Sequence, residues 1–300
     1  MDFLLTGASG LLGRAFMWEL SRRGCSFLAT SRTANFSSNP RIEALDLGDM
    51  AELELMIEEA SPKWLLNCAA YTAVDRAEAD KESAFFCNTS AVGQLAALSA
   101  RYGLCVLHIS TDYVFGNSKK RTPFTEGDRP KPCGVYGWSK FLGEELLRRL
   151  NPDGHFILRT SWLFGGGNPN FVDTMLRLSE SSNPLRVVDD QIGSPTYTPW
   201  LACAALDLIE ADARGTYHSS CAGACSWFDF AEEIFSQSAI DRQVLRQSSA
   251  QSQRPAPRPA YSVLSCKKLE EKIGSTRPPW REALGSYLSD RASPQSPGSP

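Results

Sequence analysis

The sequence predicts an α/β fold: a doubly wound parallel sheet of the Rossmann type, with a smaller, irregular α/β lobe beside it. Short apolar runs alternate with helical patterns through the first half of the chain, and these runs are apolar on both faces. Strands of that kind lie inside a parallel sheet that helices cover on both sides. Right-handed crossovers then make the sheet doubly wound. A glycine-rich turn directly after the first run is a third indication.

The elements of the first half follow from these patterns in order. The expected strands are residues 3–6, 26–31, 64–68, 105–110 and 156–159, which are short apolar runs. The expected helices are residues 11–23, 50–60, 81–101 and 137–150. The second of these helices illustrates the reasoning, because Leu53, Met56 and Ile57 recur at helical spacing.

The second half has a looser pattern. It predicts helices at residues 171–179, 199–210 and 227–236, a strand at 185–188, and a loop at 165–169. Residues 247–259, rich in Ser, Gln, Pro and Arg, are expected to form a flexible loop, and residues 293–300 a disordered tail. We therefore expect a nucleotide-binding domain over 1–160 that carries the catalytic residues, a substrate-binding lobe over 161–290 interleaved with it, and a tail over 291–300.

Composition excludes several classes of protein. The chain has 300 residues, of which 42% are hydrophobic, enough for a substantial core. Its net charge of -3 offers no footprint for nucleic acid, and no apolar stretch approaches the length of a membrane span. The nine cysteines lie mostly in apolar runs without metal-ligand spacing, so we expect reduced thiols, no metal site and a cytoplasmic location. A homodimer is compatible with the sequence, which does not fix the oligomeric state.

A glycine-rich turn joins the first expected strand to the first helix. Gly7, Gly10 and Gly13 form the pattern GxxGxxG, and Leu11 and Leu12 open the helix. One glycine allows the tight turn, another lets the backbone approach a pyrophosphate, and the third lets helix and strand pack closely. The alternative is a glycine-rich turn without a ligand, but the position between strand and helix favours a dinucleotide.

The ends of the next strands suggest which dinucleotide binds. Ser31 and Arg32 stand where an NAD-binding site usually has an acid. A hydroxyl and a guanidinium suit a 2′-phosphate, which favours NADPH over NADH, although NADH is not excluded. The alternative is a solvated surface arginine. Asp46 and Leu47 are placed to contact adenine, and the small residues at 68–70 let a cofactor lie close to the backbone.

A second motif carries the chemistry. Tyr136 and Lys140 form YxxxK at the start of a helix, so both side chains lie on one face. An ammonium there would lower the pKa of the tyrosine, which could donate a proton to a carbonyl oxygen as hydride reaches the carbon. Thr111 directly follows the fourth strand and could hydrogen-bond the same oxygen. The alternatives are turn chemistry for Thr111 and a solvated helix face for Lys140.

These motifs together resemble the extended short-chain dehydrogenase/reductase family and, within it, the dTDP-4-dehydrorhamnose reductase branch. The matching blocks are NCAAYTAVDRAE at 67–78, STDYVF at 110–115, VYGWSK at 135–140 with Gly143 and Glu144, RTSW at 159–162, NFV at 170–172, DQIGSPT at 190–196, GTYH at 215–218, and RP at 258–259 with Ser262 and Leu264. They run in family order along nearly the whole chain.

The resemblance implies a role for each matching residue. Tyr136 would be the proton donor, Lys140 would hold the nicotinamide ribose and tune Tyr136, and Thr111 would orient the ketone. The implied sugar-nucleotide contacts are Thr111, Asp112 and Trp162, and the implied cofactor contacts include Ala69, Ala70 and Tyr71. The implied reaction is reduction of the C4 ketone of dTDP-4-dehydro-6-deoxy-L-mannose to dTDP-L-rhamnose. The family often has histidine or a similar residue at position 71, and Cys133-Gly134 also departs from its usual pattern.

Two other functions compete with this one. A sugar-nucleotide dehydratase or epimerase of the same superfamily is the first, but dehydratases need Asp-Glu after the threonine, and this chain has Asp112-Tyr113. A non-catalytic protein resembling the regulatory subunit of methionine adenosyltransferase is the second. The intact set of Thr111, Tyr136 and Lys140 favours an enzyme, because a scaffold has no chemical need for all three.

Overall fold

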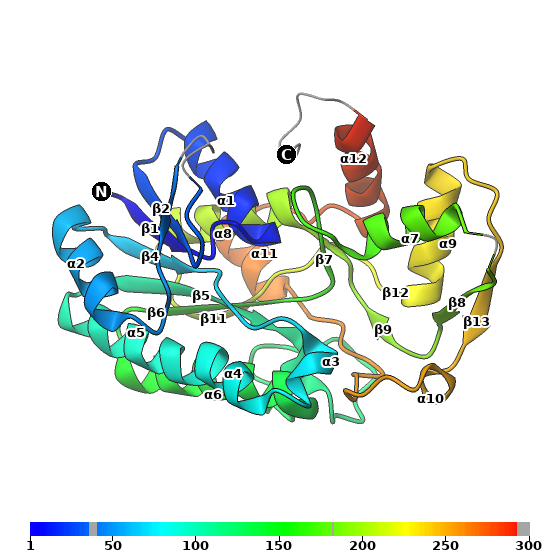
Figure 1. The fold of residues 1–300 in the computed structure, drawn as a ribbon, viewed down its shortest axis with the longest axis horizontal. Helices are drawn as coiled ribbons and strands as arrows, with labels where there is room; N and C mark the ends of the chain where they lie inside the picture. Colours follow the sequence, from blue (N-terminus) through cyan, green and yellow to red (C-terminus); the bar gives the residue numbers. More distant parts are fainter. Residues whose placement is uncertain (36–40, 182, 293–300) are drawn as a thin grey trace.

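A parallel sheet forms the centre of the larger lobe in the computed structural model, which describes residues 1–35, 41–181 and 183–292 (Figure 1). The sheet has seven strands in the order β11-β6-β5-β4-β1-β2-β3, and every neighbouring pair is parallel. In this order the strands are Gly215–His218, His155–Thr160, Cys105–Thr111, Trp64–Asn67, Phe3–Thr6, Phe27–Ser31 and Ile42–Ala44. The predicted fold class is confirmed.

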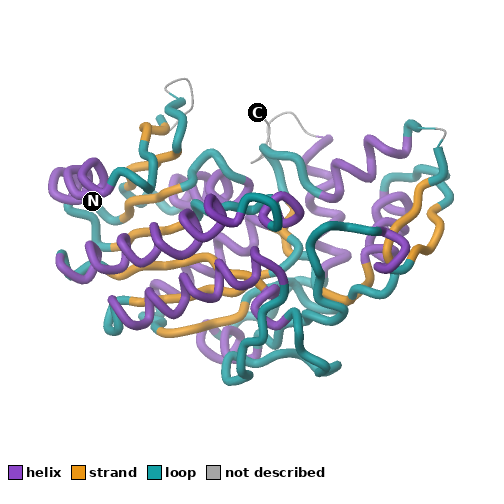
Figure 2. The backbone as a smooth tube through the Cα atoms, turned by 60° about the horizontal axis from the view of Figure 1, so that its bottom comes forward, coloured by secondary structure: helices purple, strands orange, loops and turns teal. Residues whose placement is uncertain are grey.

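Helices cover both faces of this sheet, in front of and behind the strands in Figure 2. Side chains alternate along each strand, so Phe3 and Leu5 face one layer and Leu4 faces the other. The first layer contains α1 (Leu11–Arg22), α8 (Thr198–Glu210) and α11 (Lys267–Ile273). The second contains α2 (Met50–Ala60), α5 (Ala91–Arg101) and α6 (Gly134–Leu150). The carboxyl ends of all seven strands therefore meet at one edge of a rigid sandwich.

The smaller lobe packs around its own apolar cluster, on the right of Figure 1. Its strands are β7 (Leu163–Phe164), β8 (Leu185–Val188), β9 (Ile192–Gly193), β10 (Thr196–Tyr197), β12 (Cys225–Ser226) and β13 (Val244–Gln247), joined in pairs. Its helices are α7 (Phe171–Ser179), α9 (Trp227–Gln237), α10 (Ser249–Ser252) and α12 (Trp280–Ala292). Phe164, Phe230 and Trp280 fill the centre of this cluster.

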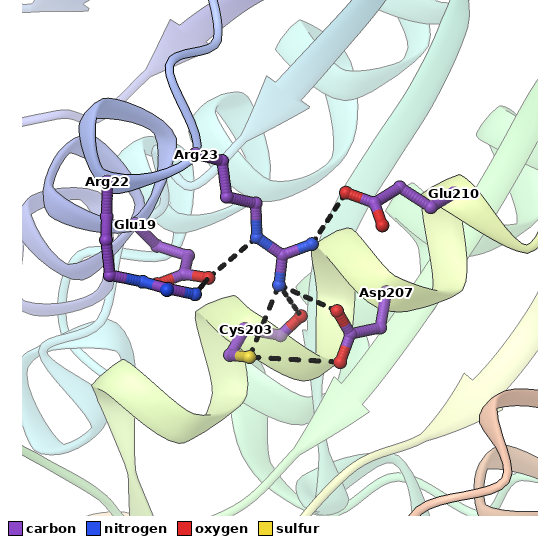
Figure 3. Close-up of polar contacts among 6 residues, drawn as sticks. All are labelled: Glu19, Arg22, Arg23, Cys203, Asp207 and Glu210. Atoms are coloured by element: carbon purple, nitrogen blue, oxygen red, sulfur yellow. Dashed lines mark hydrogen bonds and ion pairs between the residues drawn. The ribbon is translucent and has the colours of Figure 1, made fainter.

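An arginine cluster joins α1 to α8 and so ties an early helix to a late one (Figure 3). Arg23 donates from Nε to Glu19, from Nη2 to Asp207 and from Nη1 to Glu210, each over 2.7 Å. Glu19 is buried, and its pKa is lowered by hydrogen bonds from Arg22 and Arg23, although its burial acts in the opposite direction. The segment that folds back from the smaller lobe is thereby fixed to the first layer.

The helix predicted at residues 81–101 is divided into three parts. It consists of α4 (Lys81–Phe85), a π-helical turn η1 (Phe86–Ser90) and α5. The wider turn directs Asn88 inward, where its Nδ2 donates to the Tyr71 carbonyl and to the Ser139 hydroxyl, both over 3.0 Å. Periodicity does not distinguish a single π turn from the α-helix around it, and such turns are common at functional sites.

Other predicted boundaries were wrong for local reasons. Helix α6 begins at Gly134, three residues before the prediction, and the amide of Val135 donates to Glu78 over 2.8 Å. Part of the segment predicted to be a flexible loop is regular, because residue 247 ends β13 and α10 follows within a capping box. Residues 291 and 292, assigned to the tail, belong to α12, and 293–300 lie outside the described residues.

Candidate active site

The glycine-rich turn after β1 has the shape of a cradle for a phosphate group. Gly7 has a φ of +70°, and a Cβ there would lie 2.5 Å from the amide nitrogen of Ala69. A Cβ on Gly13 would lie 2.2 Å from the Gly7 carbonyl oxygen. Both positions therefore require glycine. Gly10 is exposed and caps α1 without a side chain, so the first amides of the helix, which include those of Leu11 and Leu12, are free to bind an anion. These features fit a dinucleotide.

The ends of β2 and β3 lie beside this cradle. Arg32 is exposed, whereas Ser31 is buried and its hydroxyl donates to the Thr33 carbonyl over 2.6 Å. Ser31 thus shapes the turn that presents Arg32. Asp46 is exposed and accepts a hydrogen bond from Gly48, and Leu47 is half-buried next to it.

The segment after β4 forms the next wall of the site. Ala69, Ala70 and Tyr71 are all half-buried. The Tyr71 amide donates to Asn88 Oδ1 over 2.9 Å, and its hydroxyl donates to Asp80 over 3.2 Å. The polar groups of Tyr71 are therefore already bonded within the protein, and the two alanines leave the backbone accessible.

Thr111, Asp112, Tyr136 and Lys140 come together where β5 ends. Thr111 caps the 3₁₀ turn η2 (Asp112–Phe115), because its hydroxyl accepts from the amide of Tyr113 over 3.2 Å and donates to Asp112 over 3.1 Å. The ring of Tyr136, on α6, packs edge-on against Tyr113 with ring centres 5.3 Å apart. Burial raises the pKa of Tyr136 to about 12, and hydrogen bonding with Thr111 acts in the opposite direction.

The pKa of Tyr136 is therefore above its ordinary value because of burial, whereas the YxxxK spacing predicted a lowered one. Lys140 is buried, and its Nζ donates to the Ile109 carbonyl over 2.6 Å and lies 3.3 Å from Nε2 of His108. Its hydrogen-bonding capacity is thus directed toward β5. A protonated phenol at neutral pH still suits a reductase, because the group must give a proton away.

Beneath the third turn of α6 lies a buried charge cluster whose pairing the sequence did not predict. Glu144 accepts two hydrogen bonds from Arg159 over 2.6 and 2.8 Å and one from Ser110 over 2.5 Å. Burial acts to raise the pKa of Glu144, but Arg159 holds it at about 2. Glu144 follows Lys140 by one helical turn, so this cluster fixes the face of α6 that carries Tyr136 and Lys140. Its signals in the sequence were the spacing of Lys140 and Glu144 and the presence of Ser110, Glu144 and Arg159 in the family blocks.

Asp112 has the properties expected of a ligand-binding group. It is 2% exposed, and its Oδ2 has no hydrogen-bond partner among the described residues. Burial raises the pKa of Asp112 to about 6, although hydrogen bonds from Ser262 and Thr111 act to lower it. A buried, incompletely bonded carboxylate beside a buried tyrosine is typical of a functional site.

Replacing Asp112 by asparagine is expected to raise the free energy of unfolding by about 1–3 kcal/mol at pH 8. The pKa of Asp112 is raised from 3.8 when the chain folds, so its contribution to stability is full below pH 3.8 and is lost as the pH rises past 6. Urea unfolding at pH 8 and at pH 4 measures the gain, which should disappear at the lower pH. Asp153→Asn, at an exposed position, is the matched control. Equal stability of wild type and Asp112→Asn at pH 8 would contradict the assignment.

Trp162 adopts a strained backbone at the border of the two lobes. Its φ is +48°, in the left-handed region that a bulky residue rarely adopts. The indole is stacked on Trp227 with ring centres 3.6 Å apart, and a Cβ on Gly193 would lie 2.5 Å from it. The surrounding residues thus hold a half-buried aromatic face in one orientation, which suits contact with a sugar nucleotide.

A salt bridge joins the two lobes across the same edge of the sheet. Asp75 lies in the short helix α3 (Val74–Ala77), and its oxygens accept two hydrogen bonds of 2.9 Å from Arg258 and one of 3.2 Å from the amide of Ala256. Arg258 holds down the pKa of Asp75. The charge of Arg258 also acts on Tyr113, whose ring packs on Tyr136, so the smaller lobe reaches the surroundings of Tyr136.

Comparison with known proteins assigns a family to this arrangement. Residues 1–293 match the family described as the RmlD substrate binding domain. The chain belongs to this family. The spore coat polysaccharide biosynthesis protein SpsK of Bacillus subtilis is 40% identical over 97% of this chain and 98% of its own length. The dTDP-4-dehydrorhamnose reductase of Sinorhizobium fredii is 40% identical over 82% of this chain and 88% of its own.

A solved relative connects the family to a cofactor. The dTDP-4-dehydrorhamnose reductase of Bacillus anthracis, solved in complex with NADP, superposes on this chain with a TM-score of 0.88 and 34% identity. The match covers 96% of this chain and 99% of that one. Membership of the RmlD family therefore extends over the cradle, the YxxxK pair and the smaller lobe alike.

Proposed function

We propose that this chain is a dTDP-4-dehydrorhamnose reductase that uses NADPH to reduce the C4 ketone of dTDP-4-dehydro-6-deoxy-L-mannose, giving dTDP-L-rhamnose. One observation supports this most directly: Thr111, Tyr136 and Lys140 meet at the end of β5, two strands from the glycine cradle. The relatives with that name support the substrate. In the described residues no helix is long and apolar enough to cross a membrane. We place the reaction in the cytoplasm, in keeping with nine unpaired cysteines.

The two lobes divide the binding work in this proposal. Residues 1–160 hold the cofactor, and residues 161–290 hold the sugar nucleotide, with α8 and β11 of the second range built into the first lobe. The cradle amides bind the pyrophosphate, Arg32 binds the 2′-phosphate, and Ala69 and Ala70 allow close approach of the nicotinamide half. Thr111, Asp112 and Trp162 contact the sugar nucleotide.

Proton delivery is the part of the reaction that the side chains carry out. NADPH, when bound, supplies the hydride that reduces the ketone carbon. Thr111 turns its hydroxyl proton from Asp112 to the ketone oxygen and so orients the ketone. Tyr136 gives its proton to the same oxygen, so that the carbonyl becomes a hydroxyl and the tyrosine becomes a phenolate. Lys140 stabilises that phenolate with its positive charge until a proton returns.

A substrate panel tests the proposed function. The purified protein is incubated with NADPH and each of several 4-keto sugar nucleotides, and absorbance of the reduced cofactor is followed. We expect consumption with dTDP-4-dehydro-6-deoxy-L-mannose, one NADPH for each hydroxyl formed. Absence of consumption at saturating concentrations of both ligands would refute the proposal.

Arg32→Ala is expected to weaken NADPH binding by about tenfold or more and to change NADH binding by less than about twofold. The 2′-phosphate, which NADH lacks, is the group that the guanidinium would contact. Fluorescence titration of both cofactors gives the two dissociation constants. Arg41→Ala, an exposed arginine just before β3, serves as the control for a general loss of positive charge. An equal loss of affinity for both cofactors would show that Arg32 does not bind the 2′-phosphate.

A further inference from the structure

A row of polar side chains crosses three neighbouring strands beneath Lys140. Thr6 on β1 pairs in register with Asn67 on β4, which pairs with His108 on β5. Each is at most 1% exposed. Two residues earlier in these strands, Leu4, Leu65 and Val106 face the same layer and belong to its apolar core. A polar row in such a setting must bond within itself, because water does not reach it.

The row forms a continuous chain of hydrogen bonds that ends at Lys140. Thr6 Oγ1 lies 2.8 Å from Asn67 Oδ1, and Asn67 Nδ2 lies 3.0 Å from His108 Nδ1. His108 Nε2 lies 3.3 Å from Lys140 Nζ, which also donates to the Ile109 carbonyl over 2.6 Å. His108 is therefore the last member of the row and contacts the lysine directly.

Proton counting links the direction of the bonds in this chain to the charge of Lys140. Burial, and then the positive charge of Lys140, lower the pKa of His108, so the imidazole is neutral and carries one N–H. An ammonium only donates, so with Lys140 charged, Nε2 accepts and the proton sits on Nδ1. This requires the Asn67 amide in the orientation opposite to the one given above, with its oxygen toward His108 and the Thr6 hydroxyl accepting from Nδ2. A neutral Lys140 also carries a lone pair, so Nε2 can donate to Nζ and every bond in the chain can then reverse its direction.

We propose that His108 is a positioning residue that holds Lys140 in its ammonium form, with the Asn67–Thr6 pair fixing the tautomer that makes this possible. The proposal rests on the proposed function, which assigns Lys140 the task of stabilising the Tyr136 phenolate. A charge-assisted hydrogen bond is stronger than the neutral bond that replaces it, so the row favours the charged lysine.

Other groups around Lys140 also favour or oppose its charged form. Glu144, one turn further along α6, favours the ammonium, while burial opposes it and lowers the pKa of Lys140 to about 8. Arg148 also acts on His108 from α6, and the Cys68 thiol faces Lys140 from the end of β4. The ring of His108 and the carbonyl of Ile109 are the hydrogen-bond acceptors that the described residues offer to Nζ.

The first test uses the wild-type protein and does not depend on activity. Long-range proton–nitrogen NMR of ¹⁵N-histidine-labelled protein identifies the protonated ring nitrogen of each of the three histidines. At pH 6.5 we expect the proton of His108 on Nδ1, moving to Nε2 as Lys140 loses its charge near pH 8. His218, whose Nδ1 faces the Phe124 carbonyl at 3.0 Å, should keep its proton on Nδ1 throughout and serves as an internal reference. A proton on His108 Nε2 at pH 6.5 would overturn the proposal.

The second test removes the acceptor. His108→Leu is expected to lower the pKa of Lys140 by about one unit, measured through the ¹³Cε resonance that Lys140→Met removes from the spectrum. At pH 8 the same change should lower kcat/KM about fivefold, and at pH 6 it should have little effect, because most Lys140 is then still charged. His218→Gln, which removes another buried imidazole from the same sheet face, should leave the Lys140 resonance unchanged.

The outcomes separate this proposal from the proposed function. An unchanged Lys140 titration in His108→Leu would overturn the role of His108 even if the enzyme reduces its substrate. If the wild type is inactive but the His108 tautomer changes as Lys140 loses its charge, the proposed reductase function would be refuted. The link between His108 and the charge of Lys140 would still hold. If His108→Leu does not fold, the tautomer of His108 in the wild type is sufficient to test the proposal.

Discussion

Tyr136→Phe is expected to lower kcat/KM for the 4-keto sugar nucleotide by about 100- to 10,000-fold, with little change in NADPH affinity. Tyr136 is the group that supplies a proton to the ketone oxygen, and burial raises its pKa to about 12, so at neutral pH it is fully protonated. Phenylalanine keeps the ring and its edge-on contact with Tyr113 but has no proton to give. Steady-state kinetics and cofactor titration of the same preparation separate the two effects.

Tyr113→Phe is the matched control for this experiment. It removes a hydroxyl from the neighbouring ring, whose centre lies 5.3 Å from that of Tyr136. It leaves the proton donor in place. We expect Tyr113→Phe to retain most of the activity. Turnover by Tyr136→Phe within about threefold of wild type would mean that another group delivers the proton.

Arg159→Met is expected to lower the free energy of unfolding by about 3–5 kcal/mol. Arg159 is 2% exposed and forms two hydrogen bonds to Glu144, which is completely buried. Methionine fills a similar volume but leaves the Glu144 carboxylate with Ser110 and the partly exposed Arg148. Urea unfolding at pH 7 measures the loss.

The pH dependence and a double variant test the cause of this loss. In the wild type the pKa of Glu144 is lowered to about 2, so its stabilising contribution is present above pH 4.5 and is lost as the pH falls toward 2. Without Arg159 the carboxyl takes up a proton more readily, so the deficit should shrink between pH 7 and pH 4. Adding Glu144→Gln should restore part of the stability. A deficit that is additive in the double variant would contradict a direct ion pair.

Local patterns predicted the first half of the fold well. The strand at Phe3–Thr6 and the helix at Met50–Ala60 have the predicted bounds, because each is a single apolar run or stripe between clear breaks. The strand Gly215–His218 was not predicted, although its residues were noted as a motif. It joins the edge of the sheet beside β6 only after the chain has built much of the smaller lobe, and that pairing is a tertiary contact that no local pattern records.

Prediction of the site was limited by hydrogen-bond direction rather than by residue identity. The spacing of Tyr136 and Lys140 correctly placed both on α6, yet it could not tell that Nζ turns to the Ile109 carbonyl and His108. His108 lies within a run that was interpreted as a buried strand, and its importance depends on register with Asn67 and Thr6. Register across parallel strands is set by helices between them, so one strand's sequence does not contain it.

The late return of the chain to the sheet restricts how such a protein can be re-engineered. Helix α8 and strand β11 come after the first elements of the smaller lobe, yet they belong to the larger one. A chimaera joined once at residue 160 would therefore take from the larger lobe an edge strand, β11, and the helix α8, which forms ion pairs with Arg23. Grafting a new sugar preference onto this scaffold requires exchanging separate stretches between and around α8, β11 and α11 while those three elements stay with their host.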